Sequence, residues 1–417
     1  MGVQLDQKGY QKTEIGVIPK DWCVKRLKDI AEINKESLKG NTDKEYKFYY
    51  YDLSSVNKGK LLKPTEKIQF KNAPSRARRV FKRNNILMST VRPYLQGFAY
   101  IDFESDDCIC STGFAVISGE RPSDIKYIYH NLFSYTITNQ IQRLLVGSNY
   151  PAINTEDVEN LKIPYPNNKN ERAEIASILS TWDKAIELKE KLIEQKKQQK
   201  KGLMQKLLTG EVRLPGFEGK WKEVRIKDLG TLKGGSAFPE KYQNVISGKY
   251  PFFKVSDMNN EENEKYMLNA NNYINEEIRS EIKATIIPKN SIIFAKVGAA
   301  LLLERKRILK YDSCIDNNMM ALIVKENIDF NYVYYLLLNM KLSRFSNVGA
   351  LPSLNSNDVY SLKCRLPMDY DEQKAVAELL SLFDKEIDLL QNELIQIKQQ
   401  KKGLMQLLLT GKVRVKV

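Results

Sequence analysis

The sequence predicts an α+β fold: two tandem domains of mixed α/β structure, joined by two long helices that form an antiparallel coiled coil with pseudo-two-fold symmetry. Three observations predict it. An 18-residue segment near the middle of the 417-residue chain is repeated near its end. Heptad patterns of apolar residues run into both copies, and strand-like and helix-like runs alternate in the stretches before them. The predicted segments are a first domain over 1–166, a central helix over 167–210, a second domain over 211–367, a C-terminal helix over 368–411 and a tail over 412–417.

The internal repeat is the strongest signal in the chain. Residues 197–214 read KQQKKGLMQKLLTGEVRL and residues 398–415 read KQQKKGLMQLLLTGKVRV, so 15 of 18 positions agree at an offset of 201. The same offset relates positions further upstream: Pro151 and Pro352, Asn154 and Asn355, Asp157 and Asp358. The segments between these matches diverge. Similar ends with dissimilar middles indicate one scaffold that carries two different binding regions.

Both copies of the repeat lie at the ends of predicted helices whose apolar residues follow steps of four and three. In the second helix these residues are Val376, Leu380, Phe383, Ile387, Leu390, Leu394, Ile397, Leu404 and Leu408. In the first helix they are Ile175, Leu179, Trp182, Ile186, Ile193, Leu203 and Leu207, interrupted by Lys189, Lys196 and Lys200. This is the spacing of the a and d positions of a coiled coil.

The helix ends carry typical start and stop residues. Asn170 and Asp371 are the predicted N-caps, and Gly210 and Gly411 are predicted to follow the last turns. A helix of about 40 residues is roughly 60 Å long. We expect the two helices to pair with each other, because each would otherwise expose a long apolar stripe to water. The alternative is a coiled coil that joins two copies of the chain.

Each predicted domain mixes strand-like and helix-like runs. In the first domain the strand-like runs cover 85–91 and 108–117, and the helical run covers 125–145. In the second domain the strand-like runs cover 291–297 and 318–324, and the helical run covers 332–345.

Charge and composition favour a polyanionic partner. Lys and Arg number 66 against 51 Asp and Glu, a formal net charge of +15, which is typical of proteins that bind nucleic acid. No apolar run reaches the ~18 residues of a membrane span. Residues 1–20 are polar, so we expect no signal peptide. Five scattered cysteines suggest reduced thiols in a cytoplasm.

The sequence offers little for catalysis. Its one histidine, His130, lies in an apolar and aromatic run, which favours a packed histidine over a catalytic one. The phosphate-binding pattern GxxxxGK[ST] is absent, as are the signatures of adenine methyltransferases. Glu-x-Lys triplets occur without the carboxylate cluster that Mg²⁺ needs. We therefore expect no catalytic residue, no metal site and no bound cofactor in this chain.

Basic residues are the better candidates for a binding site. Five of them fall within eight residues: Arg76, Arg78, Arg79, Lys82 and Arg83. The remaining candidates are Arg92, Lys296, Arg305 and Arg307, with the loop residues Ser148, Asn149 and Tyr150. Such side chains neutralise phosphates, and arginine also binds guanine O6 and N7 bidentately. The alternative is a solvated basic surface, and for the loop residues ordinary packing.

The doubled pattern resembles the specificity (S) subunit of type I restriction–modification systems. The motifs that carry the resemblance are KKGLMQ, LLTG and VR at the end of each long helix, G-x-x-P…N…D…P before it, E-x-x-x-I-x-x-x-L at the helix start, and a W…V-x-L-x-D opening. The resemblance covers essentially the whole chain, and the KKGLMQ–LLTG repeat is its most specific part.

The resemblance implies a non-catalytic DNA-recognition subunit that works in a prokaryotic cytoplasm. In that family each domain is a target recognition domain that reads one half of a bipartite, usually asymmetric DNA site. The two conserved helices set the spacing and dock two methyltransferase (M) subunits, and restriction (R) subunits complete the complex. S-adenosylmethionine, ATP and Mg²⁺ then belong to the partners. The helix residues expected at the partner interface are Trp182, Ile186, Ile193, Leu203, Phe383, Ile387, Leu394 and Leu404.

Two other functions stay open at this point. One is an independent nucleic-acid-modifying enzyme, which would act alone with Mg²⁺ or S-adenosylmethionine. The other is a coiled-coil adaptor for RNA or membranes, which would show no preference among duplex sequences. For a specificity subunit, a stiff helix pair predicts reading domains about one DNA turn apart, roughly 34–36 Å. Adding helical residues should then change the spacer and leave the bases read unchanged.

Overall fold

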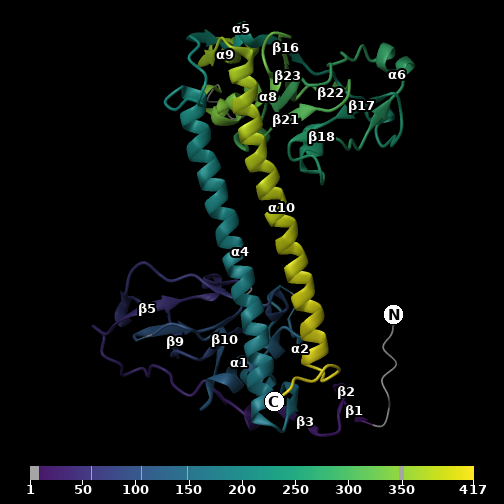
Figure 1. Cartoon of the computed structure of the whole chain (residues 1–417). Coiled ribbons are helices and arrows are strands. Elements are labelled where there is room, and N and C mark those ends of the chain that lie inside the picture. Colours follow the sequence, from purple (N-terminus) through teal and green to yellow (C-terminus); the bar gives the residue numbers. More distant parts are fainter. Residues whose placement is uncertain (1–8, 58, 105, 148, 347–351) are drawn as a thin grey trace. The chain divides into compact units, whose positions relative to one another are not determined.

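The computed structural model describes residues 9–57, 59–104, 106–147, 149–346 and 352–417. Contacts divide the chain into a first unit, Met1–Glu190 with Asn392–Val417, and a second unit, Lys191–Gln391. Two long helices are present, α4 (Lys169–Thr209) and α10 (Tyr370–Leu408), as predicted (Figure 1). Each unit therefore consists of one globular domain, the beginning of the helix that follows it, and the end of the other long helix.

The globular domain of the first unit is built on two four-stranded sheets. The first sheet has the order β11 (Phe98–Tyr100), β10 (Ile86–Ser89), β13 (Phe114–Ser118) and β4 (Glu32–Ile33). The second has the order β8 (Ile68–Gln69), β5 (Lys47–Tyr51), β12 (Cys108–Ser111) and β9 (Ala77–Val80). All four side chains of β10 are buried, as expected of a short apolar run inside a sheet. The strands predicted over 85–91 and 108–117 are confirmed, the latter as two strands separated by a turn.

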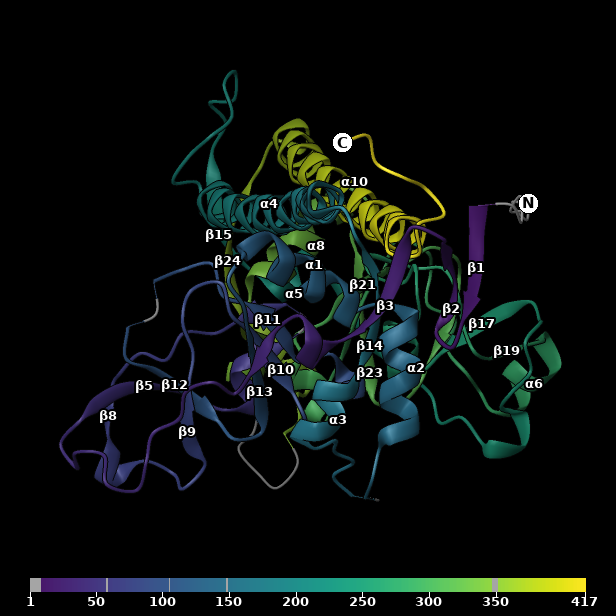
Figure 2. The ribbon, with the colours of Figure 1, turned by 90° about the horizontal axis from the view of Figure 1, so that it is seen from below.

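Three short helices complete this domain. They are α1 (Pro122–Leu132), α2 (Tyr135–Leu144) and α3 (Thr155–Asn160). The single helical run predicted over 125–145 is wrong, because Ser134 caps a new helix by accepting a hydrogen bond from the Ile137 amide at 3.2 Å. Figure 2 shows α1 between the sheet of β10 and β11 and the first turns of α4. The small hairpins are β1 (Tyr10–Thr13) with β2 (Gly16–Pro19) and β6 (Val56–Asn57) with β7 (Lys60–Leu61).

The globular domain of the second unit has a different pair of sheets. The larger one has the order β16 (Gly230–Gly234), β23 (Met319–Val324), β20 (Ile292–Ala295), β21 (Lys306–Leu309) and β18 (Tyr266–Met267). The smaller one has the order β19 (Tyr273–Ile274), β17 (Tyr250–Phe253) and β22 (Cys314–Ile315). Its helices are α5 (Ile226–Leu229), α6 (Glu276–Glu281), α7 (Ala299–Leu302), α8 (Phe330–Asn339) and α9 (Ser356–Ser361). The predicted strands over 291–297 and 318–324 are confirmed as β20 and β23.

One antiparallel strand pair closes each globular domain. In the first unit β3 (Trp22–Arg26) pairs with β14 (Lys162–Pro166), and in the second unit β15 (Trp221–Arg225) pairs with β24 (Lys363–Pro367). A strand near the start of each domain thus lies beside the strand that leads into the long helix. The repeated Asn and Asp residues upstream have a structural role, because Asn154 with Asp157 and Asn355 with Asp358 form the capping boxes of α3 and α9.

The predicted N-caps of the long helices are wrong by two residues. Asn168 precedes α4, and its Oδ1 accepts from the amide of Asn170 at 2.9 Å. Asp369 precedes α10 and accepts from the amide of Asp371 at 2.9 Å. The predicted C-terminal glycines are confirmed, since Gly210 and Gly411 have positive φ values of 73° and 68°, which favour glycine.

Within each unit the two long helices pack antiparallel through their seams. In the first unit Ile175 and Leu179 share a core with Leu404 and Leu408. In the second unit Leu203 and Leu207 pack with Val376 and Leu380. The predicted pairing of the two helices with each other is thereby confirmed inside both units.

The lysines that interrupt the seam reach acidic residues on the facing helix. In the first unit Lys189 lies 2.7 Å from Glu393, and Lys401 pairs with Asp183. In the second unit Lys196 lies 2.7 Å from Glu386, and Lys200 pairs with Asp384. A polar pair at a seam position favours one register over slipped alternatives, at some cost in stability.

A buried carboxylate anchors the chain beyond the end of α10 to the first turn of α4. Glu171, 2% exposed, accepts from Arg414 Nε at 2.6 Å and Nη2 at 2.8 Å. Trp22 Nε1 donates to the same carboxylate at 3.3 Å, and Arg414 also binds Asp21. We call Glu171, Trp22, Asp21 and Arg414 the first terminal clamp.

The second unit repeats this arrangement after the end of α4. Arg213 donates to both carboxylate oxygens of Glu372, at 2.9 and 2.7 Å. Trp221 Nε1 donates to Glu372 at 3.2 Å. The short segment that follows each long helix is therefore fastened to the domain of its own unit.

Candidate nucleic-acid interface

The predicted basic cluster of the first domain is divided between the surface and the interior. Strand β9 carries Arg78, whose guanidinium lies 4.8 Å from the centroid of the Phe70 ring. The next residue, Arg79, is turned inward and donates to the carbonyl of Phe114 and, at 3.4 Å, to Thr155 Oγ1. Burial lowers the pKa of Arg79. Arg79 therefore joins β9 to β13 and to the start of α3, whereas Arg78 stays beside its own strand and donates to the carbonyl of Ala77 at 2.9 Å.

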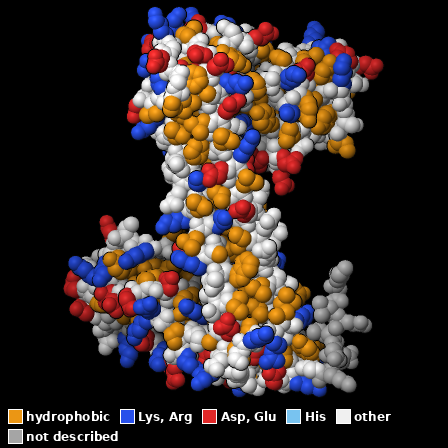
Figure 3. Space-filling view, viewed as in Figure 1, with side chains coloured by type: hydrophobic (Ala, Val, Ile, Leu, Met, Phe, Trp, Pro, Cys, Tyr) orange, Lys and Arg blue, Asp and Glu red, His pale blue; other side chains and the backbone are white. Residues whose placement is uncertain are grey.

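Two further residues of the cluster have acidic partners. Lys82 Nζ lies 2.6 Å from Glu36, and Arg83 Nη1 lies 2.5 Å from Glu104. These pairs are exposed and contribute little to stability, so DNA phosphates can compete for the cations. Arg76 is exposed, and its side chain has no ion pair within the described part of the chain. On the face of the first unit drawn in Figure 3, basic and acidic side chains are interspersed.

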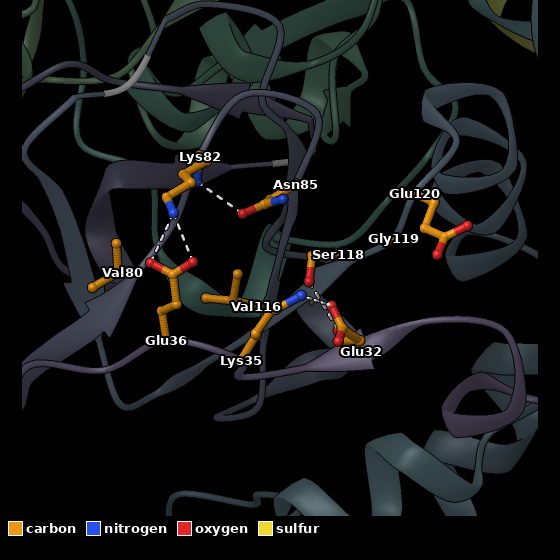
Figure 4. Close-up of a pocket in the computed structure, with 10 residues that line it drawn as sticks. All are labelled: Glu32, Lys35, Glu36, Val80, Lys82, Asn85, Val116, Ser118, Gly119 and Glu120. Carbon is orange, nitrogen blue, oxygen red and sulfur yellow. Dashed lines mark hydrogen bonds and ion pairs between the residues drawn. The ribbon is translucent and has the colours of Figure 1, made fainter.

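A shallow cavity beside Lys82 is a poor candidate for a ligand site. Its volume of about 230 Å³ is below the ~300–1,000 Å³ of usual ligand pockets. Figure 4 shows Glu36 directed at Lys82 and Glu32 directed at Lys35, 2.6 Å away. With Glu120 added, the lining holds more carboxylates than cations, which disfavours an anionic ligand.

The structure brings together three of the predicted residues at the loop after β10. Arg92 adopts a left-handed backbone, with φ of 47°, and its amide donates to the carbonyl of Pro151 at 2.7 Å. Its guanidinium lies 4.6 Å from the ring centroid of Tyr150 and donates to the carbonyl of Asn149 at 3.0 Å. Tyr150 is 70% exposed. Ser148, predicted beside them, lies outside the described residues.

The second domain places its predicted cations around the loop after β20. Lys296 is half-buried, and its side chain has no hydrogen bond or ion pair within the described residues. Arg305 donates to Asn259 Oδ1 from a half-buried position. Arg307 donates to the carbonyl of Met258 at 3.4 Å, and burial lowers its pKa. Arg307 is thus the most enclosed of the three.

Four exposed apolar residues in the segments after β10 and β20, the second of which includes the short helix α7, were not predicted from the sequence. They are Tyr94 and Leu95 in the first domain and Leu302 and Leu303 in the second. The sequence feature that could have revealed them is a pair of large apolar residues shortly after a buried strand and a turn.

The helix residues predicted at a partner interface lie in the seam. All eight are buried or half-buried: Trp182, Ile186, Ile193, Leu203, Phe383, Ile387, Leu394 and Leu404. The exposed large apolar residues of the long helices are others, namely Leu188, Leu192, Tyr370, Leu382, Leu389, Ile395 and Leu407. Exposed apolar residues off the seam are the ones available to a second protein.

The single histidine is packed against α4. His130 is 1% exposed, and its Nε2 lies 3.1 Å from Ser180 Oγ while Nδ1 lies 3.7 Å from Asp183. Burial lowers the pKa of His130 to about 3. The side chain is therefore neutral near pH 7 and belongs to the contact between α1 and α4.

Within the described residues, no group of three or more His, Cys, Asp or Glu residues is placed to hold a metal ion. In the same residues, no helix has the length and apolar character needed to cross a membrane.

Comparison with known proteins decides the family. The model of the type I restriction modification DNA specificity domain matches this chain twice, at residues 19–198 and 218–399. The chain belongs to this family. It is 24% identical to the type I restriction enzyme MjaIX specificity subunit of Methanocaldococcus jannaschii, over 97% of this chain and 96% of the relative. It is also 28% identical to the MjaVIII specificity subunit of that organism, over 65% and 66% of the two chains.

Solved structures share the fold of this type I specificity protein. One, from a study of complex assembly and conformational transition of a type I restriction–modification system, has a TM-score of 0.63 at 20% identity and covers 95% of this chain and 99% of its own. Another, the S subunit of a type I system from Mycoplasma genitalium, has a TM-score of 0.54 at 16% identity, with coverage of 93% and 96%. The predicted family, fold class and role as a specificity subunit are confirmed.

Proposed function

We propose that the two globular domains of this specificity subunit each read one half of a bipartite DNA site. The observation that carries the proposal is the doubled family match within one chain. Each matched half has its own hydrophobic core, and the two halves differ in their sheets, four plus four strands against five plus three. Two different reading surfaces on similar supports fit a site whose halves differ in sequence.

DNA contact is assigned to the cations and loops described above. In the first domain the candidates are Arg76, Arg78, Lys82, Arg83 and Arg92 with Asn149, Tyr150 and Ser148, and in the second Lys296 and Arg305. The exposed cations suit phosphate contacts, which position the protein on the duplex. Arg79 and Arg307 support the fold beneath them, since their guanidinium groups are turned to backbone carbonyls.

The long helices are proposed to set the distance between the two half-sites and to dock two methyltransferase subunits. The exposed apolar residues of α4 and α10, rather than the seam residues, would carry that contact, because the seam is already filled. Restriction subunits would complete the complex. S-adenosylmethionine, ATP and Mg²⁺ would be held by these partners, and the assembly would act on DNA in a prokaryotic cytoplasm.

A pair of matched variants tests the reading of the first half-site. Arg92→Gln removes a guanidinium held beside Asn149 and Tyr150, whereas Lys82→Gln removes an ammonium group that already has an acidic partner, Glu36. The methylated motif is mapped with each variant in the complete complex. We expect Arg92→Gln to relax one half of the motif, or to weaken methylation evenly if it holds a phosphate, and Lys82→Gln to have a smaller effect. Unchanged methylation with Arg92→Gln would contradict a DNA contact by Arg92. A change confined to the half of the motif assigned to the second domain would contradict the proposal that each domain reads its own half-site.

A further inference from the structure

The loop after an interior strand is held in the same way in both units. Val91 bridges to Ala152, and Val297 bridges to Ser353 at the matching place. The next residues, Arg92 and Gly298, both have positive φ, and their amides donate to the carbonyls of two prolines, Pro151 and Pro352, at 2.7 and 2.8 Å. Each loop therefore leaves its strand along a fixed path.

The tip of each loop exposes two adjacent large apolar side chains. Tyr94 and Leu95 are 42% and 56% exposed, and Leu302 and Leu303 are each 57% exposed. The two tips differ in sequence, PYLQ in the first domain and AALLL in the second. Unrelated sequences thus arrive at the same exposed apolar pair.

Hydrogen bonds hold the backbone at or near these tips. In the first loop the amide of Leu95 donates to the carbonyl of Arg92 at 3.0 Å, which closes the turn. In the second loop the carboxylate of Glu304 accepts from the amides of Leu342 and Ser343 at 3.1 and 2.8 Å. These hydrogen bonds fix the backbone at or beside each tip, where the apolar pairs are exposed.

One cation stands close to each tip in the sequence. Arg92 precedes the first pair with Pro93 between them, and Arg305 follows the second pair with Glu304 between them. Exposed apolar surface costs about 25 cal/mol per Å² when it stays in water. On a DNA duplex the sugar–phosphate backbone is polar, and apolar surface is offered by base faces and thymine methyl groups. An exposed apolar tip with a cation nearby is suited to reach past phosphates to the bases.

We propose that each tip is a wedge that enters a base step of the bound half-site and partly unstacks it. The inference rests on the proposed function, because it needs each domain to sit on duplex DNA. Unstacking costs a few kcal/mol per step, and burying two large side chains between bases offsets it. Pyrimidine–purine steps open most easily. The wedge therefore adds sequence preference at a step that no hydrogen bond reads.

The test uses duplexes that carry 2-aminopurine, which brightens when it is unstacked, at one position after another. The bound form is the full chain with its methyltransferase subunits, on the site established by methylation mapping. A double variant, Tyr94→Ala with Leu95→Ala, is compared with Leu62→Ala, which removes a 67% exposed leucine elsewhere in the first unit. We expect brightening at a step of one half-site with the wild type and Leu62→Ala, and loss of most of it with the double variant. Leu302→Ala with Leu303→Ala should do the same at the other half-site.

Two outcomes would overturn the wedge while leaving the proposed function intact. One is specific binding and methylation by the wild type with no brightening that depends on the tips. The other is that replacing thymines by uracil weakens binding by the wild type as much as the tip substitutions do, while no brightening is seen. The tips would then contact thymine methyl groups. Failure of the proposed function is recognised separately, since the wild type itself would then bind no site preferentially. Circular dichroism and the Tm of each variant show that its fold is retained.

Discussion

Removing Arg414 should loosen the first terminal clamp and destabilise the first unit. The substitution Arg414→Ala leaves Glu171, 2% exposed, with one remaining side-chain partner among the described residues, the indole of Trp22 at 3.3 Å. Breaking one partner of a buried ion pair costs about 3–5 kcal/mol. Because the Arg414 side chain is itself 41% exposed, water can reach part of the site, and we expect a smaller loss of about 2 kcal/mol. For a unit of this size the shift in Tm is then roughly 4–8 °C.

Hydrogen exchange on the full chain locates the effect. Amides of β3 and of the first turns of α4 should lose protection with Arg414→Ala, while amides of β15 and the start of α10 keep theirs. The matched variant Arg213→Ala, which opens the clamp around Glu372, should reverse this pattern. Adding Glu171→Gln to Arg414→Ala should recover part of the loss, because no buried charge is then left unpaired.

A free energy of unfolding for Arg414→Ala within ~0.5 kcal/mol of the wild type, the range usual for surface substitutions, would contradict a stabilising role of the first terminal clamp. A loss of protection that falls in the second unit would contradict it as well. A Glu171→Gln addition that destabilises further would show that the carboxylate is not the group left unsatisfied.

Three further predictions concern spacing, docking and pH. Four residues inserted after Gln198 lengthen α4 by at most ~6 Å. The methylated motif should therefore keep its half-sites and gain one or two base pairs of spacer. An unaltered spacer would contradict the proposal that the helices set the distance between the half-sites. Leu389→Glu changes a side chain that is 64% exposed, so it should weaken binding of methyltransferase subunits, measured by titration, with an unchanged Tm; equal affinity would remove this face from the interface. Burial lowers the pKa of His130 to about 3, so its contribution to stability is complete above pH ~6.5 and is lost as the pH falls toward 3. With His130→Gln this part of the acid sensitivity should vanish in denaturant titrations, and parallel pH profiles of the two proteins would contradict the assignment.

The long helices and the doubled organisation could be predicted because their signals are local. The alternation of Val376, Leu380, Phe383 and Ile387 fixes which face of the helix is apolar, whatever surrounds it. The helix starts were less certain, because Asn168 and Asn170 are both good N-caps and only the backbone geometry selects between them.

The details of the binding surface could not be predicted, because burial depends on residues far apart in the sequence. Arg79 looks like its neighbour Arg78 in the sequence, yet its guanidinium meets a carbonyl 35 residues away. Lys306 sits in a basic run but is 1% exposed, paired with Glu304. Sequence alone counts such residues as surface charge.

The terminal clamps were missed although the sequence carried a signal for them. Glu171 and Glu372 stand at the offset of the repeat, and so do Arg213 and Arg414. A charged pair repeated with the scaffold, rather than with the variable segments, indicates a structural role. The same comparison applied to Tyr94 and the residues after Gly298 finds no identity, which is why the exposed tips emerged only from the fold.

The most direct measurement is the methylated sequence in a genome whose cell makes this chain with its methyltransferase partner, compared with the same cell lacking the chain. The account predicts one motif that depends on the chain and consists of two unlike short halves separated by a fixed number of unspecified bases. A continuous motif, a pair of identical halves, or methylation that is the same without the chain would contradict the claim that two dissimilar domains of one subunit read the DNA.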